Sequence, residues 1–74
     1  MTRFDYINQN LPEIKEEVKM GFIPLDILNH YAIYCRYDFY RKQKINVTTS
    51  VFYASEDFNI SERTIFRIIK DMNT

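Results

Sequence analysis

The stretch FNISERTIFRIIKDM, residues 58–72, decides the fold because it contains a junction between two amphipathic segments. Asn59 stands where the chain must turn, and asparagine is one of the few residues besides glycine that tolerate the left-handed conformation that ends helices. Ser61 is a preferred helix N-cap, while Ile60 and Ile65 have the spacing of a hydrophobic staple. The stretch therefore predicts a tight, oriented turn between two helices.

The second of these helices, Glu62–Met72, carries apolar and basic side chains on opposite faces. At 100° per residue, its core-facing residues fall within a sector of about 100°; they are Ile65, Ile68, Ile69 and Met72. Arg63, Arg67 and Lys70 lie on the opposite side, within about 60° of one another. A helix about 16 Å long with its cations outward has the size and charge to lie in a DNA major groove.

The preceding helix is less sharply bounded. The run Asn46–Ser50 offers several N-caps, so we expect a helix that starts near Thr48 or Thr49 and ends at Phe58. One face of it carries Val51, Ala54, Ser55 and Phe58.

The run from Ala54 to Ile69 resembles the helix-turn-helix of bacterial transcriptional regulators and of resolvase- and transposase-type DNA-binding domains. Those domains share small residues in the first helix, a Gly-Val-Ser-like turn, and Thr-Val/Ile-aromatic-Arg in the second. Here Asn59 replaces the usual glycine, and Ala54 and Ser55 share the small position. The resemblance covers the C-terminal third of the chain, and it implies that DNA bases are contacted by Ser61, Glu62, Arg63, Phe66, Arg67 and Lys70.

The remainder of the chain also favours helices. In the N-terminal segment, 1–23, Asn10 is a candidate N-cap for a short helix that Gly21 ends, whereas the first nine residues are too short for an assignment. Pro24 opens a long central helix over 24–44. With the helix-turn-helix over 48–72, the sequence predicts one all-α domain, a small bundle of about four helices.

The central helix is apolar on two sides. One stripe, which we expect to be buried within the chain, consists of Leu28, Tyr31, Ala32, Cys35 and Phe39. A second stripe on another side consists of Ile33, Tyr37 and Tyr40. Two apolar sides need two partners, so we predict that the second stripe is the seam of a homodimer. The alternative is a monomer in which the tyrosines expose their hydroxyl groups.

Charge is balanced overall, with ten Lys/Arg and ten Asp/Glu, but it is uneven along the chain. Residues 1–35 hold three basic and five acidic side chains, net −2, and residues 36–74 hold seven and five, net +2. The basic excess therefore lies on the side of the predicted DNA-binding helix. Further contacts, to phosphates, are predicted for Arg36, Arg41, Lys42 and Lys44 and for the helix start at Thr48 and Thr49.

Several classes of protein are disfavoured. A chain of 74 residues has one modest core and little room for a catalytic cleft, and no P-loop, nucleophile elbow or metal-ligand cluster is present, so we expect neither an enzyme nor a bound metal or cofactor. His30 and Cys35 lie about 140° apart on the central helix, a poor geometry for sharing a metal. The single cysteine and the absence of a signal-like block or a long apolar run favour a cytoplasmic protein without membrane contact.

The sequence thus predicts a small protein that binds double-stranded DNA as a homodimer, and it identifies no small-molecule ligand. It would serve as a transcriptional regulator or as an accessory factor of a phage or mobile element in bacteria. The alternative is a helical adaptor whose Arg63/Arg67 face meets an acidic protein. A third possibility is the DNA-binding part of a recombinase whose catalytic domain is on another chain.

Overall fold

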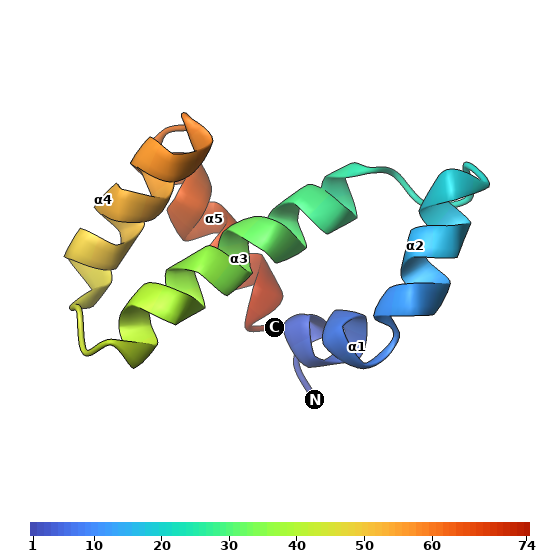
Figure 1. Ribbon diagram of the computed structural model, residues 1–74, viewed down its shortest axis with the longest axis horizontal. Coiled ribbons are helices and arrows are strands. Elements are labelled where there is room, and N and C mark those ends of the chain that lie inside the picture. Colours follow the sequence, from blue (N-terminus) through green and yellow to red (C-terminus); the bar gives the residue numbers. More distant parts are fainter.

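The computed structural model describes all 74 residues, which form five helices and no strand. The helices, in chain order, are α1 (Arg3–Gln9), α2 (Leu11–Lys19), α3 (Asp26–Lys42), α4 (Val47–Phe58) and α5 (Glu62–Met72) (Figure 1). The predicted all-α class is confirmed, with one helix more than expected. None of the five helices combines the length and the hydropathy needed to cross a membrane.

The additional helix is α1, in the segment that the sequence left unassigned. It is stabilised at its start by a capping box, in which the Thr2 hydroxyl accepts from the Asp5 N–H and the Asp5 carboxylate accepts from the Thr2 N–H, at 3.1 and 3.2 Å. Ile7 then lies in the core, and the Arg3 N–H donates to the Thr74 carbonyl at 3.0 Å. At the end of the helix the Asn10 side chain donates to the Tyr6 carbonyl at 2.8 Å. A helix of only two turns is stable here because both its ends and its apolar residue have partners.

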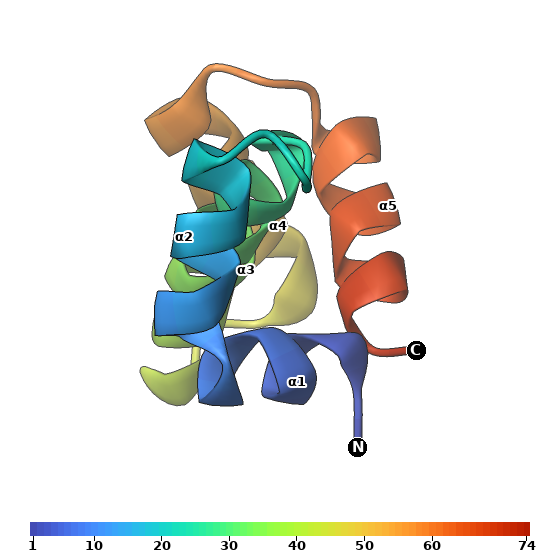
Figure 2. The same ribbon diagram turned by 90° about the vertical axis from the view of Figure 1, so that its right-hand side faces the viewer.

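The core forms where α3, α4 and α5 each pack against the other two, with α1 against α5 (Figure 2). Its nine buried apolar residues come from all five helices: Ile7, Ile14, Ile33, Tyr37, Val51, Ala54, Ile65, Ile68 and Met72. Helix α5 contributes three of them, and Ile65 and Ile68 are at most 1% exposed. Burial of each such side chain stabilises the fold by roughly 1.5–3 kcal/mol. The apolar face predicted for α5 is therefore the face that holds it to the bundle.

The turn between α4 and α5 has the predicted geometry. Asn59 adopts the left-handed conformation, with φ 55° and ψ 47°, and its N–H and that of Ile60 both donate to the Ser55 carbonyl. Two residues later the Ser61 hydroxyl accepts from the Thr64 N–H at 3.2 Å and so caps α5. Three residues thus end one helix and start the next in a defined direction.

The turn between α3 and α4 differs slightly from expectation. Helix α3 ends at Lys42, because the chain reverses through Lys44 in a left-handed conformation, φ 66°. Helix α4 starts at Val47, earlier than predicted, because the side chain of Asn46 accepts from the Thr49 N–H at 2.8 Å.

The two apolar stripes of α3 are covered differently from the prediction. In the stripe expected inside, Leu28 and Tyr31 are partly buried against the core, but Ala32 and Phe39 are exposed. Ile33 and Tyr37 are 7% and 9% exposed and lie in the chain's own core, so they cannot form a dimer seam. Phe39, expected inside, is 49% exposed. Periodicity identifies an apolar stripe but does not specify which neighbour covers it. Helices α4 and α5 pack on the side of Ile33, which leaves the side of Phe39 open.

Three tyrosines of α3 connect it to other parts of the chain through their hydroxyl groups. Tyr31 donates to the Asn8 side chain on α1 at 2.6 Å, and Tyr34 donates to the Asn73 side chain beyond α5 at 2.9 Å. Tyr40, also predicted in the dimer seam, donates to the carboxylate of Asp57 on α4. Tyr40 therefore has its partner within the chain.

The assignment of the two stripes can be tested by two truncations. Ile33→Ala should lower the free energy of unfolding by about 2–5 kcal/mol, because it leaves a cavity in the core. Phe39→Ala should change it by no more than about 0.5 kcal/mol, as is usual for exposed side chains. Urea denaturation followed by circular dichroism measures both, and a larger loss for Phe39→Ala than for Ile33→Ala would contradict the observed burial.

The left-handed residue in the α4–α5 turn gives a second test. Asn59→Ala should cost about 1 kcal/mol of stability, because a Cβ without a polar group disfavours this conformation, whereas Asn59→Gly should preserve stability. Gln43→Ala is the matched control, since Gln43 ends α3 at φ −88°, where alanine meets no strain. Equal effects of alanine at 43 and 59 in thermal denaturation would refute the role of the turn.

Candidate nucleic-acid interface

The outward face of α5 is a basic surface. Arg63, Arg67 and Lys70 are exposed, and together with Thr64 and Phe66 they line a shallow hollow of about 380 Å³. The chain has two ion pairs, Arg36 with Asp57 and Lys42 with Asp38, and neither involves α5. The three cations are therefore free to meet an anion from another molecule. We call Arg63, Phe66, Arg67 and Lys70 the basic face.

Phe66 gives this face an apolar contact in addition to its charge. Its side chain is 47% exposed, and it precedes Arg67 in the sequence, three residues after Arg63 and four before Lys70. Residues at these spacings are neighbours on a helix surface. Phe66 therefore adds an apolar surface to the three cations, and Phe39 and Phe52 are exposed elsewhere on the chain to the same extent, 49% and 47%.

The other two residues predicted at DNA bases have different positions. Ser61 uses its hydroxyl within the helix, as the N-cap, and it also shares a hydrogen bond with the Thr64 hydroxyl at 2.9 Å. Glu62 is exposed in the first turn, about 100° around the helix from Arg63. A carboxylate there interacts favourably with the N–H groups at the helix start. The structure therefore places four of the six predicted residues, those of the basic face, together on one exposed surface.

Most of the basic residues predicted at phosphates have partners within the chain. Arg36 lies with its Nε 3.8 Å from a carboxylate oxygen of Asp57, and Arg41 donates to the Ile45 carbonyl at 2.7 Å. Lys42 lies 2.9 Å from Asp38, whose hydrogen bond and charge raise the pKa of that ammonium. The spacing of Asp38 and Lys42, four residues apart on one helix, already indicates their pair in the sequence, whereas the pair of Arg36 with Asp57 joins α3 to α4 and depends on the tertiary structure.

The remaining predicted phosphate contacts lie around the α3–α4 turn. Lys44 and Thr48 are exposed, while the N–H of Thr49 is already bonded to Asn46. Arg36 lines a separate groove to which α5 contributes no residue. The structure thus does not bring Arg36 together with the basic face.

No group of three or more His, Cys, Asp or Glu side chains is placed to hold a metal ion. Cys35 is a free thiol, half-buried on α3. The feature that sequence reasoning missed is the open groove along α3 beside this residue. The sequence indicates this groove only through the apolar stripe that ends at Phe39, and we expected that stripe to lie in the core.

The cap that orients α5 can be tested directly. Ser61→Ala should lower stability by about 1 kcal/mol, and Ser61→Asp should retain most of it, because a carboxylate also accepts the N–H of the first turn. Chemical denaturation of both variants measures the difference. Equal losses for the two variants would show that the hydroxyl is not acting as a cap.

No protein-family model, curated protein or solved structure matches this chain. The likeness of residues 54–69 to helix-turn-helix domains therefore stays a resemblance in residue pattern. What supports a functional interpretation is the geometry of α4, the turn and α5, and the unpaired charges of the basic face.

Proposed function

We propose that this chain binds double-stranded DNA by placing α5 in the major groove. The observation that carries the proposal is the basic face. It has three cations without carboxylate partners around a half-exposed phenylalanine, on the outer side of a helix that is capped and joined to α4 by the turn Asn59–Ser61. Net charge does not oppose this proposal. Attraction to DNA depends on the local field, and the acidic excess lies in the first 35 residues.

The dimensions of α5 fit the proposal. A helix of this length is about 16 Å long, and the major groove of B-DNA is about 12 Å wide and admits one helix. In this arrangement Arg63 and Arg67, one turn apart, donate to guanine edges, and Phe66 contacts a thymine methyl group. Lys70, at the far end of α5, donates to a further base edge.

The biological role that fits best is that of a small transcriptional regulator or an accessory factor of a phage or mobile element. One recognition helix reads few base pairs, and DNA-binding proteins of this size commonly bind two half-sites as dimers, about 34–36 Å apart. A homodimer of this chain would have to use a surface other than Ile33 and Tyr37, which are core residues.

The competing proposal is a helical adaptor. It is favoured by the same basic face, because Arg63, Phe66 and Arg67 could meet an acidic protein as readily as DNA, and by the neutral overall charge. The two proposals differ in what they predict for binding to duplex DNA.

Binding of a labelled mixed-sequence duplex, followed by fluorescence anisotropy over a range of salt concentrations, tests the proposal. Three to five phosphate contacts should give a slope of log K against log salt of roughly −3 to −4.5. Arg63→Ala/Arg67→Ala should weaken binding at least about tenfold, since each arginine pairing with guanine contributes roughly 1–3 kcal/mol. The matched control is Lys15→Ala/Lys19→Ala, which removes as much charge from α2.

Unchanged binding by the Arg63/Arg67 variant, or the absence of salt-dependent binding by the unmodified chain, would contradict the proposal and favour the adaptor. Selection of bound duplexes from a random pool then separates one-copy from two-copy binding. Inverted repeats of a short site would indicate two copies, and a single short site would indicate one.

A further inference from the structure

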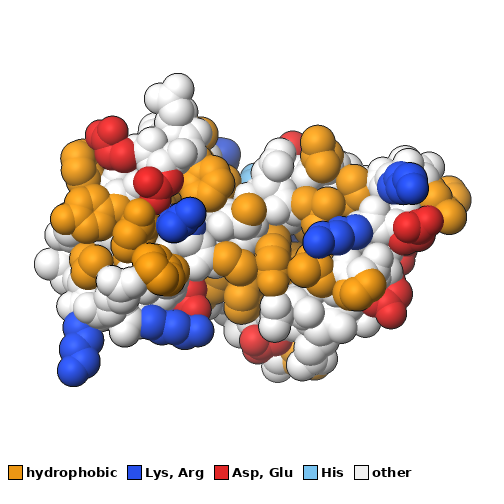
Figure 3. Space-filling model, viewed as in Figure 1, with side chains coloured by type: hydrophobic (Ala, Val, Ile, Leu, Met, Phe, Trp, Pro, Cys, Tyr) orange, Lys and Arg blue, Asp and Glu red, His pale blue; other side chains and the backbone are white.

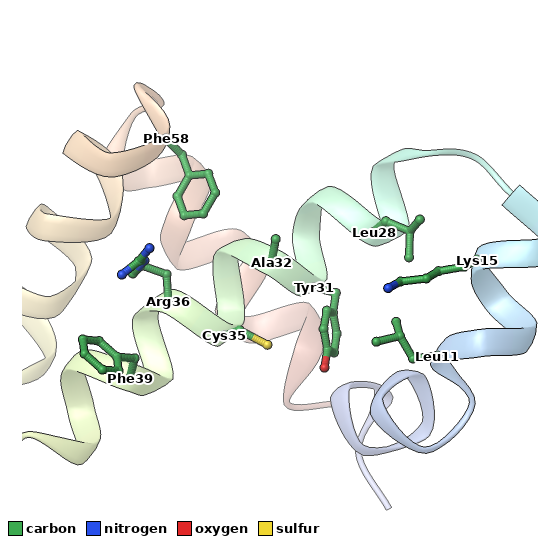
Figure 4. A pocket seen from close by; sticks show the side chains of 9 residues that line it. All are labelled: Leu11, Lys15, Leu28, Tyr31, Ala32, Cys35, Arg36, Phe39 and Phe58. Carbon is green, nitrogen blue, oxygen red and sulfur yellow. The ribbon is translucent and has the colours of Figure 1, made fainter. Parts of the chain in front are cut away.

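A second surface lies along α3, on the side opposite α5. It is an open groove of about 560 Å³ whose floor is the apolar stripe of Leu28, Ala32, Cys35 and Phe39 (Figure 4). Leu11 on α2 and Phe58 at the end of α4 also line it. The space-filling view shows hydrophobic side chains across this face of the molecule (Figure 3). We call this surface the α3 groove.

The floor of the α3 groove has the spacing of a helix-packing seam. Leu28, Ala32, Cys35 and Phe39 are separated by four, three and four residues, the pattern with which one helix packs along another. Ala32, the smallest of them, lies in the middle and is exposed, so a second backbone can approach closely there. The stripe is about 16 Å long, which corresponds to about three turns of a partner helix.

The charges around the α3 groove indicate which charges its occupant must carry. The lining includes two cations, Lys15 on α2 and Arg36 on α3, and no Asp or Glu (Figure 4). Lys15 belongs to neither ion pair of the chain. Arg36 is held by Asp57 at 3.8 Å with both side chains substantially exposed, and such surface pairs contribute little. Lys15 is therefore free to meet a carboxylate of an occupant, and Arg36 can do so by exchanging its weak surface pair with Asp57.

A second copy of the chain that packed groove against groove does not fit this pattern. Its own α3 groove would bring a further Lys15 and Arg36 to the same interface, and like charges across an interface are unfavourable. An occupant with an apolar middle and acidic ends would complement both the floor and the rim.

We propose that the α3 groove binds an amphipathic helix of another protein. Its apolar residues, at i, i+4 and i+7, pack on Leu28, Ala32 and Cys35, and carboxylates near its two ends pair with Lys15 and Arg36. This binding does not rest on DNA binding. Because α5 lies on the other side of α3 (Figure 2), an occupant of the groove leaves the basic face free.

The test uses two synthetic helical peptides with the same leucine and alanine stripe, one with glutamates and the other with lysines at its ends, each labelled for fluorescence anisotropy. The unmodified chain should bind the glutamate peptide at least about tenfold more tightly than the lysine peptide. Lys15→Glu/Arg36→Glu should reverse that preference. The control Lys19→Glu/Lys44→Glu changes the same charge away from the groove and should leave the preference as it was.

A steric variant separates binding in the α3 groove from general attraction to the protein. Ala32→Trp fills the middle of the floor. Because Ala32 is exposed, the variant should keep the helical circular dichroism spectrum of the unmodified chain. Its binding of the glutamate peptide should be at least about tenfold weaker. The proposal is overturned if neither peptide binds, if Ala32→Trp binds as well as the unmodified chain, or if the charge reversal leaves the preference unchanged.

Two other occupants would also overturn it. Sedimentation that shows self-association lost in Ala32→Trp would assign the α3 groove to a second copy. Displacement of the peptide by dodecanoate at a lower concentration than by unlabelled peptide would assign it to a small anionic amphiphile.

Discussion

Burial of the isoleucine face of α5 is the constraint on which the rest of the structure depends. Ile65 and Ile68 are almost fully enclosed by α3, α4 and α1, and with these side chains inside the helix cannot rotate about its axis. That rotation decides where Arg63 and Arg67 point. The same hydrophobic contacts that stabilise the small bundle therefore present the basic face to the outside. The turn at Asn59 determines the direction in which α5 leaves α4, and the cap at Ser61 determines the residue at which α5 begins.

Local features could be predicted from the sequence because neighbours along the chain determine them. The conformation of Asn59, the cap at Ser61 and the two faces of α5 depend on residues within one or two turns, and each is as expected. The faces of α3 could not be predicted, because both of its stripes are apolar and only the packing of α4 and α5 decides which is covered. Ile33 and Phe39 exchanged roles for that reason.

Charge partners depend on how individual side chains pack. Helix α5 has no ion pair, although Arg67 and Asp71 have the same i, i+4 spacing that lets Asp38 and Lys42 pair on α3. Arg36 meets Asp57 across two helices, and that contact needs the tertiary structure. The outcome is a molecule with two separate surfaces on opposite sides of α3, one basic and one apolar with a basic rim. A neutral chain can thus present local fields that its net charge conceals.

The tyrosines of α3 report on its packing through their ultraviolet absorbance. The chain has no tryptophan, and Tyr31, Tyr34 and Tyr40 each connect α3 to a different element. Burial raises the pKa of Tyr31 and Tyr34, and the hydrogen bond to Asp57 raises the pKa of Tyr40. The neutral phenols therefore stabilise the fold below the ordinary tyrosine pKa of about 10, and this contribution is lost as the pH rises through the raised values. Ionisation of these three phenols is therefore coupled to the separation of α3 from its neighbours.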